Sequence, residues 1–233
     1  MTLFALKLIA VGTMLIDHVG LLFFPEEQMF RVIGRIAFPI FAWGIANGYH
    51  HTTDVKKYLS RLLLLAVVSQ VPYSFIFGTL YGIPWRMNIF VTLALGLVTI
   101  MLYERFRHDV LRRRFCVMGM IAMSLLIPTG YGVYGLVMIL LFHTTYGKTR
   151  DMLLWQGLWF AVILFATQHI AAVAPTMFLV YLALPSFIQG ASLCALPLLA
   201  MYNQQKGYSG HAWWFYWFYP VHLTFLFILY VFG

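Results

Sequence analysis

The sequence predicts an all-α protein: a polytopic transmembrane helical bundle that forms one integral membrane domain over residues 1–233. Three observations predict this class, because 62% of the residues are hydrophobic, only 9% are charged, and the mean hydropathy is +0.84. A soluble globular domain has roughly 45–50% apolar and about 25% charged residues. A soluble chain of this composition would lack polar residues for its surface, so soluble enzymes, disordered chains and disulfide scaffolds are excluded.

A helix needs about 20 apolar residues to cross the hydrocarbon core of a bilayer. Nine segments suit this role, and eight to ten spans is the range that the sequence supports. In chain order they are roughly Leu3–Phe24, Met29–His50, Lys57–Gly78, Met87–Tyr103, Phe115–Pro128, Tyr131–Tyr146, Met152–Ala171, Thr176–Tyr202 and Ala212–Phe232. Pro185 and Pro197 interrupt the long eighth segment, which we expect to be kinked or re-entrant.

The basic residues predict the orientation of the chain. Twelve of the 15 lie at the start of the first span or in alternate loops: Lys7, Lys56, Lys57, Arg61, Arg105, Arg107, Arg112, Arg113, Arg114, Lys148, Arg150 and Lys206. The intervening loops hold one basic residue, Arg86. The positive-inside rule therefore places the N-terminus in the cytoplasm and the C-terminus outside.

This distribution also explains the net charge of +8 as a topology signal, so no nucleic-acid partner is expected. The run Arg112–Arg114 is placed to contact anionic membrane lipids as well. No glycine-rich phosphate loop, CxxC pair or HExxH helix is present, and no metal site is predicted.

Arg31 and Arg35 are the two remaining basic residues, and both lie inside the predicted second span. Their i, i+4 spacing puts both guanidinium groups on one helix face. Burying an arginine in a membrane costs at least about 2.5 kcal/mol, so each should meet an anion or water. The alternative for Arg31, which lies nearer the helix end, is a side chain that reaches back to the membrane surface.

Asp17 and His18 form the other ionisable cluster, on the first span and at a depth comparable to that of Arg35. We expect Asp17 to pair with one arginine, which leaves one positive charge uncompensated. A site with spare positive charge and a titratable imidazole suits an anionic ligand or a developing oxyanion. A purely architectural Asp–Arg pair beside a packed histidine is the alternative.

Lys7 and His18 lie 11 residues apart on the same helix face, at a separation of about 16 Å. One helix thus offers a cation near the cytoplasmic surface and a base deep in the membrane. A long ligand with an anionic head and a reactive tail would span that distance. Equally, Lys7 could serve only as a topology anchor.

Three further segments carry polar residues at membrane depth. On the last span, Tyr216, Tyr219 and His222 follow one another at i, i+3 steps and form a polar stripe. Gln70 on the third span and Asn88 at the outer end of the fourth span are also candidates for substrate binding. Each could instead hydrogen-bond a neighbouring helix.

These residues together resemble the TraX family, known for the acetylase that modifies conjugative pilin. The matching stretches cover most of the chain: Lys7-Leu8-Ile9-Ala10, Leu15-Ile16-Asp17-His18, Gly34-Arg35-Ile36-Ala37-Phe38-Pro39-Ile40-Phe41, His51-Thr52, Lys57-Tyr58-Leu59-Ser60-Arg61-Leu62, Ser69-Gln70-Val71-Pro72, Asn88-Ile89-Phe90-Val91-Thr92-Leu93, Tyr131-Gly132 and Phe218-Tyr219-Pro220-Val221-His222-Leu223. The family looks like a branch of the clan of integral membrane acyltransferases. A basic residue upstream of a first-helix histidine is typical there, as with Lys7 and His18.

The resemblance implies transfer of an acyl group, with acetyl-CoA as donor, to an acceptor outside a bacterial cytoplasmic membrane. His18 would then act as general base or acyl carrier, with Asp17 and Arg35 as its catalytic neighbours. Lys7, Arg31, Gln70, Asn88, Tyr219 and His222 would bind substrate. The acceptor could be a peptide, a glycan, a lipid or a small amine.

Two other functions remain open on the sequence. Intramembrane Asp, His and Arg also build the proton relays of small proton-coupled secondary transporters. No inverted repeat of the kind found in many transporters is visible. A non-catalytic membrane assembly factor is the third possibility, and it would tolerate replacement of Asp17, His18 and Arg35.

Overall fold

The computed structural model describes residues 1–173, 187–208 and 213–233. In this part of the chain the regular elements are helices, which confirms the predicted all-α class, and one isolated bridge joins Met87 to Thr129. The chain divides into two compact units. The first comprises Met1–Phe41, Val68–Pro84 and Ser186–Gly233, and the second comprises Ala42–Val67 and Trp85–Pro185.

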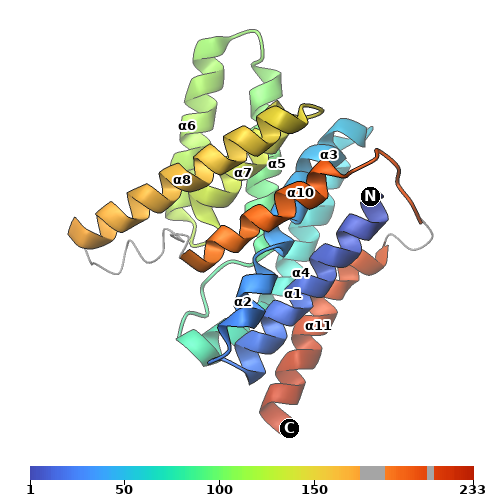
Figure 1. Cartoon of the computed structure of the whole chain (residues 1–233), viewed down its shortest axis with the longest axis vertical. Helices are drawn as coiled ribbons and strands as arrows, with labels where there is room; N and C mark the ends of the chain where they lie inside the picture. The colour runs from blue at the N-terminus through green and yellow to red at the C-terminus, as the bar shows by residue number, and fades with distance from the viewer. Residues whose placement is uncertain (174–186, 209–212) are drawn as a thin grey trace. The chain divides into compact units, whose positions relative to one another are not determined.

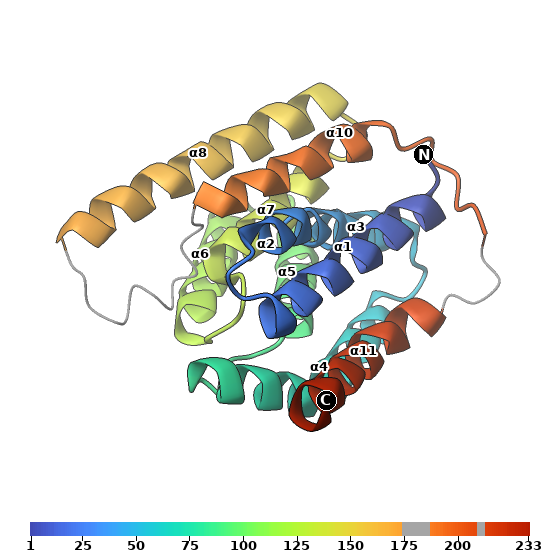
Figure 2. The same ribbon diagram turned by 60° about the horizontal axis from the view of Figure 1, so that its bottom comes forward.

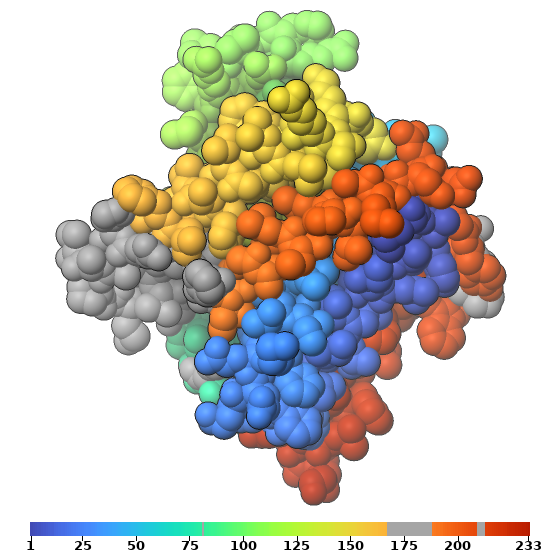
Figure 3. Space-filling model, in the orientation of Figure 1, coloured from blue at the N-terminus to red at the C-terminus, as the bar shows by residue number. Residues whose placement is uncertain are grey.

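The first unit is built around helix α1 (Leu3–Phe23). The hydroxyl of Thr2 caps this helix by accepting a hydrogen bond from the N–H of Ala5 at 3.2 Å. Helix α1 packs against α2 (Gln28–Gly34) and α11 (Trp213–Phe232), as Figure 1 shows. The 3₁₀ helix η1 (Phe187–Cys194) runs into α10 (Ala195–Ala200) and lies against α2, seen as orange against blue in Figure 3.

The predicted second span, Met29–His50, is not one continuous helix. It divides into α2 and α3 (Ala37–His51), separated by a turn at residues 35–36. Pro39 explains the division, because it has no N–H to donate to the carbonyl of Arg35 and its ring would clash with that carbonyl. The break therefore places Arg35 at the end of a short helix rather than inside a long one.

Helices α4 (Val55–Tyr81) to α8 follow in chain order, and the second unit holds most of them. Helix α5 (Ile89–Arg105) packs against α6 (Val110–Leu126) and α7 (Gly132–Thr144), and α7 also packs against α8 (Thr149–Val173). Figure 2 follows these helices along the chain. The buried side chains at the centre of the second unit include Leu97, Ile100, Leu136 and Ile139.

Helix α6 begins earlier than the sequence predicts. The carboxylate of Asp109 accepts a hydrogen bond from the N–H of Arg112 at 3.0 Å and so caps the helix. The basic run Arg112–Arg114 consequently lies in the first turns of α6 and not in a loop.

Four described helical segments are long and apolar enough to cross a membrane: Leu3–Phe23, Gln28–His51, Val55–Leu80 and Trp213–Phe232. They correspond to the first, second, third and last predicted spans. Gly132–Thr144 and Ile188–Ala200 are apolar but shorter. The total of nine spans and the side of the N-terminus stay predictions, and residues 176–186 of the eighth span, with Pro185, lie outside the described residues, as does Ala212.

Gly20 allows α1 and α2 to approach closely. A Cβ atom at this position would lie 2.1 Å from Cβ of Phe30 and 2.6 Å from its Cγ. Gly12 on the same helix has no heavy atom within 4 Å of the corresponding position. The two glycines therefore form a matched pair, one at a helix contact and one in open space.

We expect Gly20→Ala to destabilise the protein by about 1–3 kcal/mol, because the added methyl group forces α1 and α2 apart. Gly12→Ala should leave stability unchanged or raise it by up to about 1 kcal/mol through helix propensity. Thermal unfolding of both variants in detergent, followed by tryptophan fluorescence, measures the difference. Equal midpoints would contradict the close contact at Gly20.

Candidate functional site

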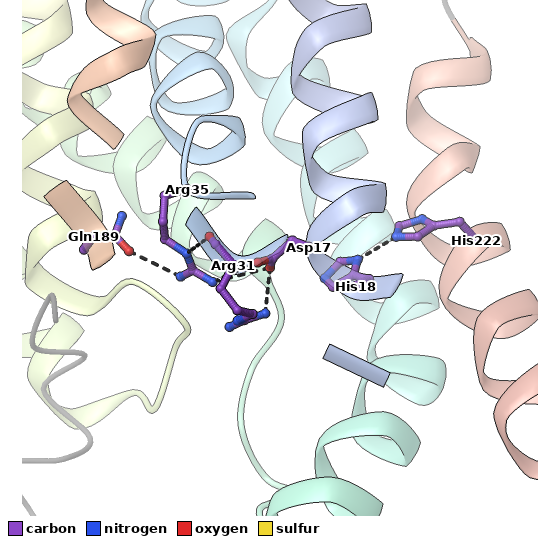
Figure 4. A network of polar contacts seen from close by, with 6 residues as sticks. All are labelled: Asp17, His18, Arg31, Arg35, Gln189 and His222. Carbon is purple, nitrogen blue, oxygen red and sulfur yellow. Dashed lines mark hydrogen bonds and ion pairs between the residues drawn. The ribbon is translucent and has the colours of Figure 1, made fainter. Parts of the chain in front are cut away.

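Helix α1 presents two successive ionisable residues to two different neighbouring helices. Asp17 and His18 are adjacent in the chain, and successive side chains on an α-helix point about 100° apart. Asp17 consequently faces α2, while His18 faces α11 (Figure 4). The predicted catalytic residues Asp17 and His18 thus contact different partners, and their functional role stays a prediction.

The carboxylate of Asp17 contacts both arginines. Nη1 of Arg31 lies 2.9 Å from Oδ2 of Asp17, and Nη2 of Arg35 lies 3.1 Å from Oδ1 and 3.4 Å from Oδ2. The side chains of Asp17 and Arg35 are 14% and 16% exposed, while that of Arg31 is 30% exposed. The sequence predicts pairing with one arginine only, and the structure corrects this to two. The three groups together still carry one net positive charge.

Gly34 makes room for this carboxylate. A Cβ atom at Gly34 would lie 2.3 Å from both Cβ and Oδ1 of Asp17. The backbone of α2 therefore lies directly against the Asp17 side chain. The same short helix positions the arginines on either side of that contact, and Nε of Arg35 donates a hydrogen bond to the carbonyl of Arg31 at 3.2 Å.

Gln189 joins the charged group, and the sequence prediction missed it. Nη1 of Arg35 donates a hydrogen bond to Oε1 of Gln189 at 3.3 Å (Figure 4). Gln189 lies in η1, is only 5% exposed, and its Nε2 has no hydrogen-bond partner among the described residues. The available signal was a single glutamine within the apolar stretch that ends the predicted eighth span.

The other half of the site is a pair of histidines. Nδ1 of His18 lies 2.8 Å from Nε2 of His222 on α11, and the two rings are stacked with centroids 5.0 Å apart. The two residues are 8% and 6% exposed. The edge-on ring of Tyr219, itself buried, packs against both imidazoles. Two candidates from the predicted stripe on the last span, Tyr219 and His222, thus meet His18.

The remaining candidates lie elsewhere. Lys7 is on α1, about 16 Å from His18 along the helix, with Nζ 5.3 Å from the ring centroid of Phe215. Gln70 donates a hydrogen bond to Oγ of Ser74, one turn along its own helix, at 2.9 Å. None of these contacts tests a role in substrate binding.

Asn88 caps the start of α5. Its Oδ1 accepts a hydrogen bond from the N–H of Phe90 at 3.0 Å, and its Nδ2 donates to the carbonyl of Ala66 at 2.6 Å. The residue is fully buried and belongs to the second compact unit. These contacts support the helix-to-helix role for Asn88, and binding of substrate by its side chain stays a prediction.

The first unit therefore places a buried imidazole pair and a charged group on two different faces of one helix. An imidazole can exchange a proton or carry an acyl group. Fixed guanidinium groups with one excess positive charge can stabilise an anionic ligand or the negative charge that develops in a transition state. The arrangement thus combines a group that can exchange protons with a group that can stabilise negative charge.

Comparisons with known proteins agree on one family. A family described as TraX protein matches residues 2–230. The "Probable fimbrial assembly protein FimC, serogroup H1" of Dichelobacter nodosus is 29% identical over 242 residues, which cover 96% of this chain and 93% of that protein. "Protein TraX" of Escherichia coli is 28% identical over 144 residues, or 60% of this chain and 55% of that protein.

An uncharacterized protein of Rickettsia prowazekii (strain Madrid E) is 33% identical over 91 residues, which cover 39% of this chain and 33% of that protein. No solved structure shows significant similarity to the chain. The family relationship of this chain therefore rests on sequence similarity.

A double-mutant cycle tests the Asp17–Arg35 contact. Asp17→Asn leaves two partly buried arginines without their carboxylate and should destabilise the protein by about 3–5 kcal/mol. With Arg35→Gln added, we expect a coupling energy of about 1–3 kcal/mol between the two sites.

Arg31→Gln provides the comparison, because its more exposed side chain should couple more weakly to Asp17. Unfolding of the three single variants and two double variants in detergent gives both coupling energies. Additive effects for Asp17 and Arg35 would show that the ion pair does not stabilise the fold.

Proposed function

The chain belongs to the TraX family, and on that premise we propose that it is an integral membrane acyltransferase. It would move an acetyl group from cytoplasmic acetyl-CoA to an amine or hydroxyl acceptor at the outer face of a bacterial cytoplasmic membrane. One observation carries the proposal: the buried imidazole of His18 on α1 is next in the chain to Asp17, whose carboxylate contacts Arg31 and Arg35 at the neighbouring α2. Keeping one buried and three partly buried ionisable side chains within apolar helices is costly, and a catalytic site is a reason to retain them.

In the proposed reaction, the imidazole of His18 takes the proton of the acceptor as its nitrogen or oxygen attacks the thioester carbonyl carbon. The carbon–sulfur bond then breaks, and the departing coenzyme A sulfur receives the proton from the imidazole. In a two-step version, His18 attacks first and carries the acetyl group to the acceptor. Both versions develop negative charge on the thioester oxygen, which the excess positive charge near Asp17 would stabilise.

Lys7 supports a cytoplasmic entry for the donor. Coenzyme A combines several phosphates with a long arm that ends in the thioester. An ammonium group near the start of α1 suits the phosphates, and the helix separates it from His18 by about 16 Å. Gln189 adds a buried amide group beside Arg35, at the charged end of the site.

The acceptor is a peptide, a glycan, a lipid or a small amine. The fimbrial name of the Dichelobacter relative makes pilin-type peptides the first class to assay. A small proton-coupled transporter is the competing function, because a histidine pair and an Asp–Arg group can also pass protons. Turnover of acetyl-CoA separates the two functions.

We expect His18→Gln to abolish acetyl transfer while the protein still inserts and keeps its thermal midpoint within a few degrees. General base catalysis contributes roughly 10²–10⁴ to a rate, so the loss should be at least 100-fold. The assay follows radiolabelled acetyl groups from acetyl-CoA to water, to the protein and to the acceptor in detergent.

His108→Gln is the matched control, because this histidine is exposed, accepts a hydrogen bond from its neighbour Arg107, and should leave turnover unchanged. Retained transfer in His18→Gln would refute the assignment of His18. Proton uptake driven by a substrate in liposomes, without acetyl-CoA turnover, would establish the transporter instead.

Lys7→Gln should raise the KM for acetyl-CoA about tenfold with little change in kcat, because it removes a charge that meets the donor in ground state and transition state alike. Lys7→Arg keeps the charge and should stay near the wild-type KM. Steady-state kinetics with acetyl-CoA as the varied substrate give both constants. An unchanged KM in Lys7→Gln would assign Lys7 to topology alone.

A further inference from the structure

The hydrogen-bond chain at His222 determines which nitrogen of His18 is free to react. Nδ1 of His222 lies 2.7 Å from the carbonyl oxygen of Phe218, one turn earlier in α11. A carbonyl oxygen can only accept a hydrogen bond, so Nδ1 of His222 must carry the proton in this contact. In a neutral ring, Nε2 of His222 is then an acceptor.

The proton on Nδ1 of His222 also fixes the direction of the hydrogen bond between the two histidines. Nε2 of His222 faces Nδ1 of His18 at 2.8 Å. Because Nε2 of His222 is the acceptor, Nδ1 of His18 must donate, and Nε2 of His18 holds the free lone pair. The described contact of the His18 ring with His222 is made through Nδ1 and not through Nε2.

Both rings are neutral in this arrangement for an electrostatic reason. Asp17, Arg31 and Arg35 already carry one net positive charge beside His18. Protonation of the histidine pair would add a second positive charge to this region. Among the described residues, Asp17 is the carboxylate that contacts the arginines there. The neutral pair avoids that repulsion.

We propose that His222 is the positioning residue of His18: it holds the imidazole as the tautomer with a proton on Nδ1 and a reactive lone pair on Nε2. The proposal rests on the proposed function, in which His18 is the base or acyl carrier. When Nε2 of His18 takes the acceptor's proton, the proton on Nδ1 can pass to Nε2 of His222. The positive charge is then shared by the rings of His18 and His222. The carbonyl oxygen of Phe218 accepts a hydrogen bond from Nδ1 of His222 throughout.

The packing supports a positioning role for His222. The ring of Phe218 stacks on His222 at 4.7 Å, and Tyr219 meets both imidazoles edge-on. His222 is therefore held by its own helix, independently of His18. His18 is in turn oriented by His222, which is the arrangement in which a base is aligned by a fixed hydrogen-bond partner.

Nitrogen NMR tests the tautomer directly. In detergent micelles with ¹⁵N-labelled histidine, the signals of His18 are identified by their absence from the His18→Gln variant. We expect a protonated Nδ1 and an unprotonated Nε2 in the wild-type protein. A wild-type His18 with its proton on Nε2 would overturn the proposal. This measurement needs no activity, so it is independent of the proposed acyl transfer.

Two substitutions at His222 extend the test. The carboxamide oxygen of His222→Gln lies as many bonds from Cβ as Nε2 does, so this variant keeps the acceptor, whereas His222→Leu removes it. We expect His222→Leu to shift the proton of His18 toward Nε2 and to lower kcat by about 10- to 100-fold without changing the KM for acetyl-CoA.

His222→Gln should retain the wild-type tautomer and most of kcat. A His222→Leu protein with the wild-type NMR signals and the wild-type kcat would overturn the positioning role. If His222→Leu fails to fold, the glutamine variant still decides: loss of the wild-type tautomer there contradicts the acceptor role of Nε2.

Discussion

The partly buried carboxylate of Asp17 is the constraint on which the first compact unit depends. An uncompensated charge at this position would be unfavourable in a membrane, so the chain must bring cations to it. Two guanidinium groups meet it from α2, and this requires the backbone of α2 to lie against α1. Gly20 and Gly34 permit that approach, and the break before Pro39 ends α2 at the second arginine.

The same constraint organises the candidate site. Because Asp17 must face α2, the next residue on α1 is rotated toward α11, where His222 and Tyr219 receive it. The charged group and the histidine pair thus lie on two different faces of one helix. In the proposed reaction, such fixed groups would need little rearrangement as charge develops on the thioester oxygen.

The sequence predicts much of this site because intramembrane charge is rare. Asp17, His18, Arg31 and Arg35 are conspicuous in apolar segments, and helical periodicity places the two arginines together. Composition likewise predicts the all-α class. The first, second, third and last spans coincide with helical segments long and apolar enough to cross a membrane.

Other features of the site could not be predicted, because they depend on contacts between residues far apart in the chain, and helical periodicity gives no information on such contacts. The direct His18–His222 hydrogen bond joins positions 204 residues apart, and Gln189 reaches Arg35 from 154 residues away. To predict that both arginines contact Asp17, one would need to know the register in which α1 packs against α2. The division of the second span is caused by Pro39, which is a local signal. The sequence nevertheless predicts one continuous span there, because the residues around Pro39 are apolar.

Gly34 has a consequence for how variation in this family should be interpreted. It has no functional group, yet any side chain there would occupy the space of the Asp17 carboxylate. A methyl group at this position would therefore push the Asp17 carboxylate away from its two arginine partners. The three charged residues themselves would be unchanged. Loss of function in a Gly34 variant would accordingly be an electrostatic defect with a steric origin, and an inventory of reactive side chains would not contain its cause.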